Sequence, residues 1–233
     1  MAEELLKIEH LTKRYGGLTA LDQVSFTLES GRIIGLLGPN GSGKTTLIKL
    51  ANGLLVPSDG KIYLGGFEPG VESKSIVSDL PDANYLPTWM NIQGLLEMFE
   101  DFYNDFDIEK AKEMVGTLNL SMNSRLKTLS KGNKEKVQLI LAMSRKAKVY
   151  FLDEPIGGVD PAARDFILNT IITNYSEDAT VVLSTHLISD IERVLDEVLF
   201  LDRGHLLFHR SVDEIRETEG KSVDQLFREV FRC

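Results

Sequence analysis

The chain contains a single cysteine, Cys233, so a framework of disulfide bonds is excluded and a reducing compartment is expected. Its 233 residues, 42% of them hydrophobic, are enough to build a sizeable apolar core without such cross-links. No apolar run approaches the ~20 residues that a membrane-spanning helix requires. Residues 1–7 are acidic and poor in apolar side chains, which does not predict a signal peptide. We therefore expect a cytosolic protein that reaches a membrane only through a partner.

An excess of positive charge is also missing. Aspartate and glutamate number 35 against 26 lysines and arginines, which gives a formal net charge of −9 and an isoelectric point near 5.0. Domains that bind nucleic acids broadly need a basic surface, so we expect no nucleic-acid partner. Internal repeats and low-complexity linkers are absent from the sequence as well. The length fits one large domain, with or without an inserted subdomain.

What the chain does have is a glycine-rich loop between an apolar run and a helical stretch. Residues 38–46 read Gly-Pro-Asn-Gly-Ser-Gly-Lys-Thr-Thr and match G-x-x-x-x-G-K-[ST], the phosphate-binding loop of nucleotide hydrolases. Residues 33–37 predict a strand before the loop, and residues 45–51 predict a helix after it. Glycines let the backbone point N–H groups at phosphates, and the helix adds the positive end of its dipole. The loop therefore predicts a nucleoside triphosphate site.

Two side chains of this loop have predicted roles in the chemistry. Lys44 is expected to reach the β- and γ-phosphates, and the Thr45 hydroxyl is expected to bind Mg²⁺. A glycine-rich turn that contains Lys-Thr by chance is the alternative. Four fixed positions arise by chance in a chain of this length with a probability on the order of 1%. The flanking strand and helix make that alternative weak.

A second apolar run, residues 149–152, leads into two acids, Asp153 and Glu154. Asp153 is predicted to hold Mg²⁺ directly or through water, and Glu154 to polarise the attacking water as a general base. A strand that ends in two acids is common, and alone it would indicate only a solvated strand end. Together with the phosphate loop it favours a site for phosphoryl transfer.

The apolar spacing changes along the chain. Apolar residues at 92, 95, 96, 99, 102, 103 and 106 predict a helix with one apolar stripe, which places Phe99, Phe102 and Phe106 in a core. Further predicted elements are helices at 108–118, 129–144 and 161–175, buried strands at 149–152 and 180–184, a hairpin around 202–204, and two short helices within 212–232. The strands at 149–152 and 180–184, with the helix at 161–175 between them, are expected to form a βαβ crossover.

Two more segments complete a pattern. Leu129-Ser130-Lys131-Gly132-Asn133 precedes Asp153, and Thr185-His186 follows the next strand. In this order the chain resembles the ATP-binding subunit of an ABC transporter, from about residue 6 to about residue 210. The A-loop, Walker A, Q-loop, signature, Walker B, D-loop and switch histidine of that family each have a counterpart.

The resemblance implies an α/β fold, the P-loop NTPase fold of ABC ATPases. That fold has a mixed β-sheet core, an antiparallel β-subdomain and an inserted α-helical subdomain. The nucleotide-binding domain would span residues 1–210, with the helical subdomain at about 85–130 and a C-terminal helical tail at 211–233.

The resemblance also assigns the site residues. Tyr15 would stack on adenine, and the alternative is a surface tyrosine before the turn at Gly16-Gly17. His186 would touch the γ-phosphate and act in catalysis with Glu154. Asp160 would sense the partner's site, or cap the helix that starts at Pro161. The Walker A residues that would bind ATP are Gly38, Pro39, Asn40, Gly41, Ser42, Gly43, Lys44, Thr45 and Thr46.

The signature would press on ATP held by the opposite subunit, through Leu129, Ser130, Lys131, Gly132 and Asn133. Ser130 could also act simply as a helix N-cap, and both roles are compatible. The family most often has Leu-Ser-Gly-Gly-Gln here, so Lys131 and Asn133 are departures. Asp82 stands where the Q-loop glutamine is usual, and its carboxylate could hold Mg²⁺ through water.

The function implied is that of an ATPase that binds ATP and Mg²⁺ and pairs head to tail, as a homodimer or heterodimer, around two ATP molecules. It would drive a separate integral membrane permease from the inner face of the cell membrane. The stretch around residues 82–89 resembles exporter-type cassettes. The alternatives are an ABC-type ATPase that energises a soluble assembly or repair complex, and a nucleotide-binding regulator without hydrolysis.

Overall fold

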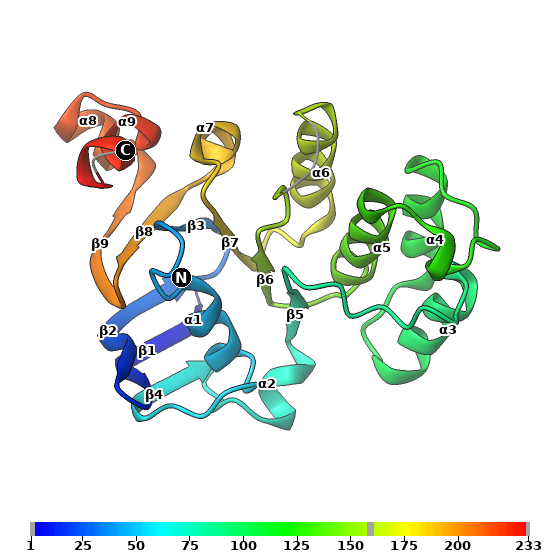
Figure 1. Ribbon diagram of the computed structural model, residues 1–233, viewed down its shortest axis with the longest axis horizontal. Helices are drawn as coiled ribbons and strands as arrows, with labels where there is room; N and C mark the ends of the chain where they lie inside the picture. Colours follow the sequence, from blue (N-terminus) through cyan, green and yellow to red (C-terminus); the bar gives the residue numbers. More distant parts are fainter. Residues whose placement is uncertain (1–2, 158–160, 232–233) are drawn as a thin grey trace.

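A six-stranded mixed sheet lies at the centre of the protein (Figure 1). The computed structural model describes residues 3–157 and 161–231. The strand order is β5-β6-β7-β3-β8-β9, in which neighbours are parallel except for the antiparallel pair β8 and β9. The strands span β3 (Ile33–Leu37), β5 (Val77–Leu80), β6 (Val149–Asp153), β7 (Thr180–Thr185), β8 (Glu197–Asp202) and β9 (His205–Ser211).

The register of this sheet aligns the carboxyl ends of three strands that are distant in sequence. Asp153 of β6 pairs with Ser184 of β7, and Leu37 of β3 pairs with Thr185 of β7. Every residue of these three strands is buried, because helices cover one face and the second sheet covers the other. That is why they read as continuous apolar runs rather than as alternating patterns.

A smaller antiparallel sheet with the order β2-β1-β4 packs against the central one. It is built from β1 (Glu4–Tyr15), β2 (Leu18–Glu29) and β4 (Asp59–Leu64). Its apolar face shares one core with helix α1 (Lys44–Ala51) and with alternate residues of the central strands, such as Phe151. In the first hairpin, cross-strand pairing continues to the turn at Tyr15 and Leu18.

The opposite face of the sheet carries a second core with most of the remaining helices. Figure 1 shows α3 and α4 beyond the β5 edge of the sheet, with α5 between them and the strands. Asn91, Asp107 and Ser130 cap three of these helices by accepting a backbone N–H three residues on. The helices span α2 (Val71–Ser75), α3 (Ile92–Phe102), α4 (Ile108–Thr117), η1 (Leu126–Thr128), α5 (Lys131–Met143), α6 (Pro161–Asn174), α7 (Ile188–Ile191) and η2 (Glu192–Val194).

The C-terminal residues form two short helices, α8 (Val212–Glu219) and α9 (Val223–Phe231). The rings of Phe227 and Phe231 pack against Phe200 of β8, which joins the tail to the central sheet. Across residues 3–157 and 161–231, no helix has both the length and the apolar character needed to cross a membrane.

The predicted fold class, α/β with a mixed sheet, an antiparallel sheet and inserted helices, is confirmed. One core assignment was wrong, because Phe102 is 76% exposed. Helix α3 ends at Phe102, and Tyr103 already has extended backbone. Phe99 does pack on the core, and its ring centroid lies 5.7 Å from that of the buried Phe106. Periodicity identifies the apolar face of a helix but not how far the neighbouring elements extend along it.

Candidate active site

The glycine-rich loop runs from the carboxyl end of β3 into helix α1 and ends at Lys44, the first helical residue. Gly43, at the N-cap, has a φ of 113°, a left-handed conformation that favours glycine. The Ser42 N–H donates to the Pro39 carbonyl across 3.1 Å, which closes the loop into a tight turn. Backbone N–H groups in the first turn of a helix have no acceptor within the helix, so α1 presents donors where the loop ends.

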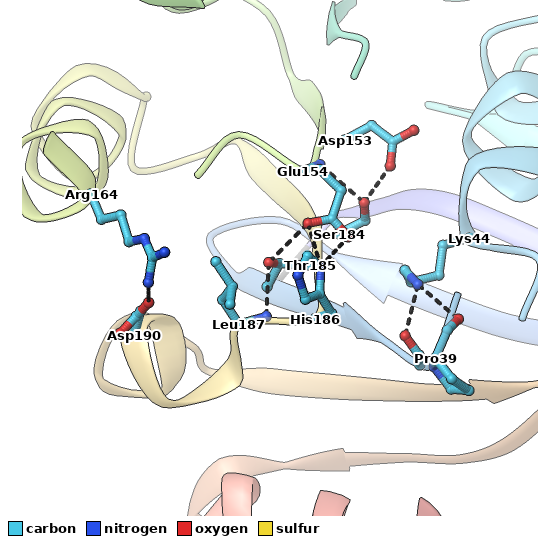
Figure 2. A network of polar contacts seen from close by, with 11 residues as sticks. Pro39, Lys44, Asp153, Glu154, Arg164, Ser184, Thr185, His186, Leu187 and Asp190 are labelled. Carbon is cyan, nitrogen blue, oxygen red and sulfur yellow. Dashed lines mark hydrogen bonds and ion pairs between the residues drawn. The ribbon is translucent and has the colours of Figure 1, made fainter. Parts of the chain in front are cut away.

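The Lys44 ammonium is folded back over this loop. It is 7% exposed, and it donates to the Gly38 carbonyl at 2.7 Å and the Pro39 carbonyl at 3.1 Å (Figure 2). Burial lowers the pKa of Lys44, and the negative charges of Glu154 and Asp153 oppose this effect. The loop and the end of β6 therefore lie within electrostatic reach of each other. A buried cation that donates to carbonyl oxygens is suited to exchange them for an anionic ligand.

Asp153 ends β6 and is 3% exposed. The Ser184 hydroxyl, opposite it on β7, donates to one carboxylate oxygen, Oδ1 (Figure 2). The sequence analysis missed Ser184. The signal was available in principle, because two adjacent parallel strands with aligned ends bring their last residues together.

Glu154 follows the strand with a φ of 53°, a left-handed backbone that costs a non-glycine residue about 1 kcal/mol or more. Its N–H donates to the Ser184 carbonyl at 3.0 Å, which holds the residue at the sheet edge. The Thr185 hydroxyl lies 3.2 Å from one carboxylate oxygen, and Nδ1 of His186 lies 3.1 Å from both (Figure 2). Strained backbone that is held in place by its surroundings is a common feature of active sites.

The hydroxyl and carboxylate oxygens at this edge are suitable ligands for a magnesium ion. Hydroxyl and carboxylate oxygens are the ligands Mg²⁺ prefers, and it is commonly bound through one or two protein groups plus phosphates and water. Thr45 is exposed at the start of α1, and Asp153 has one carboxylate oxygen that Ser184 does not contact. Within the described residues no three acidic, histidine or cysteine side chains group as a metal site. A divalent ion held by these oxygens would complete its coordination with phosphate and water oxygens.

The structure also places the predicted residues Tyr15 and Asp82. Tyr15 ends β1, is partly exposed, and has the Lys13 ammonium 5.1 Å from its ring centroid. Asp82 follows β5 and lines a cavity of about 50 Å³ together with Asp153 and Glu154. Asp82 thus lies at the same carboxyl edge of the sheet as the two acids, because β5 is parallel to the neighbouring β6.

The signature-like segment runs from η1 into helix α5, whereas the phosphate loop runs from β3 into helix α1. Ser130 caps α5, with its hydroxyl accepting the Asn133 N–H at 3.3 Å. Lys131 lines the small cavity beside Glu154 and forms an ion pair with Glu135 at 3.7 Å. Where the chain is described, no hydrogen bond or ion pair joins residues 129–133 to residues 38–46. Asp160 lies outside the described residues.

Comparison with known proteins identifies the family. A family profile described as "ABC transporter" matches residues 21–157, more than half of the chain. The chain belongs to the ABC transporter family. It is 32% identical over 231 residues to the ABC transporter ATP-binding protein YdbJ of Bacillus subtilis, covering 96% of this chain and 74% of YdbJ. The linearmycin resistance ATP-binding protein LnrL of the same organism is 30% identical, covering 87% and 68%.

The solved structures agree with this membership. The structure of an ATP-binding subunit of an ABC transporter superposes with a TM-score of 0.89 at 27% identity, covering 97% of this chain and 99% of that one. The chain is therefore an ATP-binding, ATP-hydrolysing subunit of the ABC transporter type, as its sequence motifs predicted.

Proposed function

We propose that this ABC ATPase pairs head to tail around two MgATP molecules and drives a separate membrane permease, in export. The observation that carries the proposal is the convergence at one sheet edge of Lys44, Asp153, Glu154 and His186. Asp153 ends β6, Glu154 and His186 directly follow β6 and β7, and Lys44 opens the helix after β3.

ATP would bind with its phosphates on residues 38–46 and its adenine on the ring of Tyr15. Lys44 would exchange its carbonyl partners for β- and γ-phosphate oxygens. Hydrogen bonds to these charged oxygens offset the desolvation of the ammonium better than bonds to neutral carbonyls do. Thr45 and Asp153 would hold Mg²⁺, which neutralises charge that develops on the phosphates. Asp82 would reach the same ion through water.

Hydrolysis would use Glu154 as the general base. Its carboxylate would take a proton from a water molecule whose oxygen attacks the γ-phosphorus, while the bond to the bridging oxygen of ADP breaks. His186 and Thr185 now hold this carboxylate, so its orientation is already limited before nucleotide arrives. His186, exposed on its outer side, would contact the γ-phosphate.

A second subunit would complete each site. The signature residues of the partner, equivalent to Leu129–Asn133 here, would close on the γ-phosphate with the positive end of their helix. Asp160 would sense the partner's site across the same interface. ATP would bind the closed pair better than the open one and so shift the population toward closure.

The permease would dock beside the β5 edge. A cavity of about 390 Å³ opens there between the sheet and the inserted helices, lined by Tyr85, Phe99, Tyr103 and Arg145 among others. Trp89, which lies in the loop before helix α3, is 78% exposed. Large exposed aromatics beside a cavity are typical of protein interaction sites. The similarity to a resistance protein, LnrL, favours export, and the site of action would be the cytoplasmic face of the membrane.

Phosphate release with Mg²⁺ and ATP tests the catalytic part. Glu154→Gln is expected to lower turnover by about 10²–10⁴-fold while it keeps ATP binding and traps the dimer, which light scattering after gel filtration detects. Glu177→Gln, an exposed acid in a loop, is the control and should hydrolyse ATP normally. Equal turnover in both variants, or no turnover in the unaltered protein, would reject the proposed base.

Co-purification from detergent-solubilised membranes tests the partner. The unaltered protein is expected to retain a membrane protein, and Trp89→Ala to lose it with ATP hydrolysis unchanged. Phe67→Ala changes an exposed aromatic elsewhere on the surface and should keep the partner. A protein that stays alone, or that retains only soluble partners, would favour a soluble ATP-driven complex instead.

A further inference from the structure

Three backbone segments that are distant in sequence meet at Gly204. They are the turn between β8 and β9, the phosphate loop and β2. Gly204, in the turn between β8 and β9, donates its N–H to the Ser42 carbonyl at 2.9 Å. The Gly204 carbonyl accepts the N–H of Asp22 in β2, also at 2.9 Å. A single residue of the turn thus bridges the phosphate loop and the first hairpin of the protein.

The packing around this bridge leaves no room for side chains. A β-carbon on Gly204 would lie 2.8 Å from the Ala20 carbonyl oxygen, and one on Gly43 of the phosphate loop would lie 2.7 Å from the same atom. Gly204 also has a φ of 82°, which L side chains rarely adopt. Both the close approach and the conformation require glycine, because the obstructing atom belongs to the backbone.

The hairpin that receives this bridge also carries Tyr15. Asp22 and Ala20 lie in β2, and the pairs Lys13–Leu21, Arg14–Thr19 and Tyr15–Leu18 connect that strand to β1. The path from the phosphate loop to the Tyr15 ring therefore consists of Gly204, β2 and a short antiparallel ladder. Every step of this path is a backbone hydrogen bond or a pairing between neighbouring strands.

We propose that Gly204 is a positioning residue that keeps the phosphate loop and the Tyr15 hairpin at a fixed separation. The two ends of ATP are then recognised together rather than independently. Gly204 touches no part of the nucleotide in this arrangement. The inference rests on the proposed contact between Tyr15 and adenine, and it adds the element that couples this contact to the phosphates.

A double-mutant cycle tests the coupling. The Kd for a fluorescent ATP analogue is measured for the unaltered protein, Tyr15→Ala, Gly204→Ala and the double variant. Tyr15→Ala is expected to raise the Kd about tenfold, as for loss of one base–aromatic stack. Gly204→Ala should raise it similarly, and the double variant should be little worse than Gly204→Ala alone. Gly66→Ala is the control, since Gly66 has the same φ of 82° but open space around its β-position; its effect should multiply with that of Tyr15→Ala.

A second measurement needs no variant and serves if Gly204→Ala does not fold. Magnesium tripolyphosphate, which has no adenine, is added to the unaltered protein and hydrogen exchange is followed. Slower exchange in residues 18–22 as well as in residues 38–46 is the expected result. Unchanged exchange in 18–22, or effects of Tyr15→Ala and Gly204→Ala that multiply, would overturn the role of Gly204. No effect of Tyr15→Ala on the Kd would instead reject the adenine contact, and the exchange experiment would still decide the bridge.

Discussion

The carboxyl edge of the central sheet and the segment 81–106 beside it both hold candidate functional residues, but they are built differently. At the sheet edge, Lys44 and Asp153 are buried, and their positions follow from strand register. In the segment 81–106, Tyr85, Trp89 and Phe102 are exposed, and only part of the segment is helical. We propose the first region as the reaction site and the second as a contact surface.

The two regions also differ in what holds them. Hydrogen bonds along buried parallel strands fix the sheet edge. The outer segment, residues 81–106, is joined to the rest by isolated contacts and not by a continuous ladder. The Lys146 N–H donates to the Asp105 carbonyl at 2.9 Å, and Nε of Arg145 lies 2.6 Å from Oδ1 of Asp105. The Arg145 guanidinium also lies over the Tyr103 ring, 3.9 Å from its centroid. The comparison indicates that variants should lose chemistry at the edge, and stability or docking in the outer segment.

Among the variants that compare these two regions, Lys44→Ala should have the largest effect, and it tests the sheet edge. We expect ATP hydrolysis to fall by about 10²–10³-fold, because a positioned charge on the transferring phosphate is lost. The rate of phosphate release measures this. Lys49→Ala, an exposed lysine on the same helix, should hydrolyse ATP like the unaltered protein, and a comparable loss in both would argue against a specific role for Lys44.

Asp105→Ala tests what holds the outer segment. It leaves the Arg145 guanidinium buried without its carboxylate, which is expected to lower the free energy of unfolding by about 3 kcal/mol. Urea unfolding measures the change. The control is Lys146→Ala, which removes an exposed lysine from its pair with Asp107 and should cost at most about 1 kcal/mol. Similar losses in the two variants would contradict a special role for the buried pair.

Asp79 lies on β5, at the boundary between the two regions. Its titration makes the free energy of unfolding depend on pH. Burial raises the pKa of Asp79 to about 6, while the Nδ2 donor of Asn52, at 2.7 Å, opposes the rise. Because the folded pKa lies above the unfolded one, the protonated carboxyl favours the fold. This stabilising effect is complete below the unfolded pKa of 3.8 and is lost as the pH rises through about 6.

Asp79→Asn keeps an acceptor for Asn52 and removes the charge. It should raise the free energy of unfolding at pH 7 by about 2 kcal/mol, with a gain that grows from pH 4 to pH 6 and is constant above. Urea titrations at several pH values measure it. Asp101→Asn, on the exposed side of α3, should show no such growth. A gain at pH 7 no larger than at pH 4 would contradict the raised pKa.

Phe102→Ser should have the smallest effect and sharpens the view of the outer segment. We expect the free energy of unfolding to change by less than about 0.5 kcal/mol, because the ring is already in water. Phe99→Ser, one turn earlier on the same helix, should cost about 2–3 kcal/mol, since that ring packs on the core. If the two variants were equally destabilised, Phe102 would have to be buried in solution.

The sheet edge was largely predictable from the sequence, and the outer segment was not. The loop at 38–46 and the acids at 153–154 are defined by residue types at short spacing, so local pattern was enough to find them. The aromatic positions at 99, 102 and 106 share one periodicity, yet Phe102 is exposed and Phe106 lies beyond the helix. Periodicity reports the local backbone, whereas burial depends on which distant element lies opposite.

The sequence by itself determined that this protein binds a nucleoside triphosphate. A tight glycine turn, a lysine and two acids at the end of a strand are local features, and together they are typical of phosphate and magnesium binding. Only the tertiary structure decided that Ser184 would donate to Asp153, that Arg145 would hold Asp105, and that Gly204 would bridge Ser42 and Asp22. Each of these contacts joins residues far apart along the chain. Their formation depends on strand order and on the packing of the two sheets, which no short stretch of residues specifies alone.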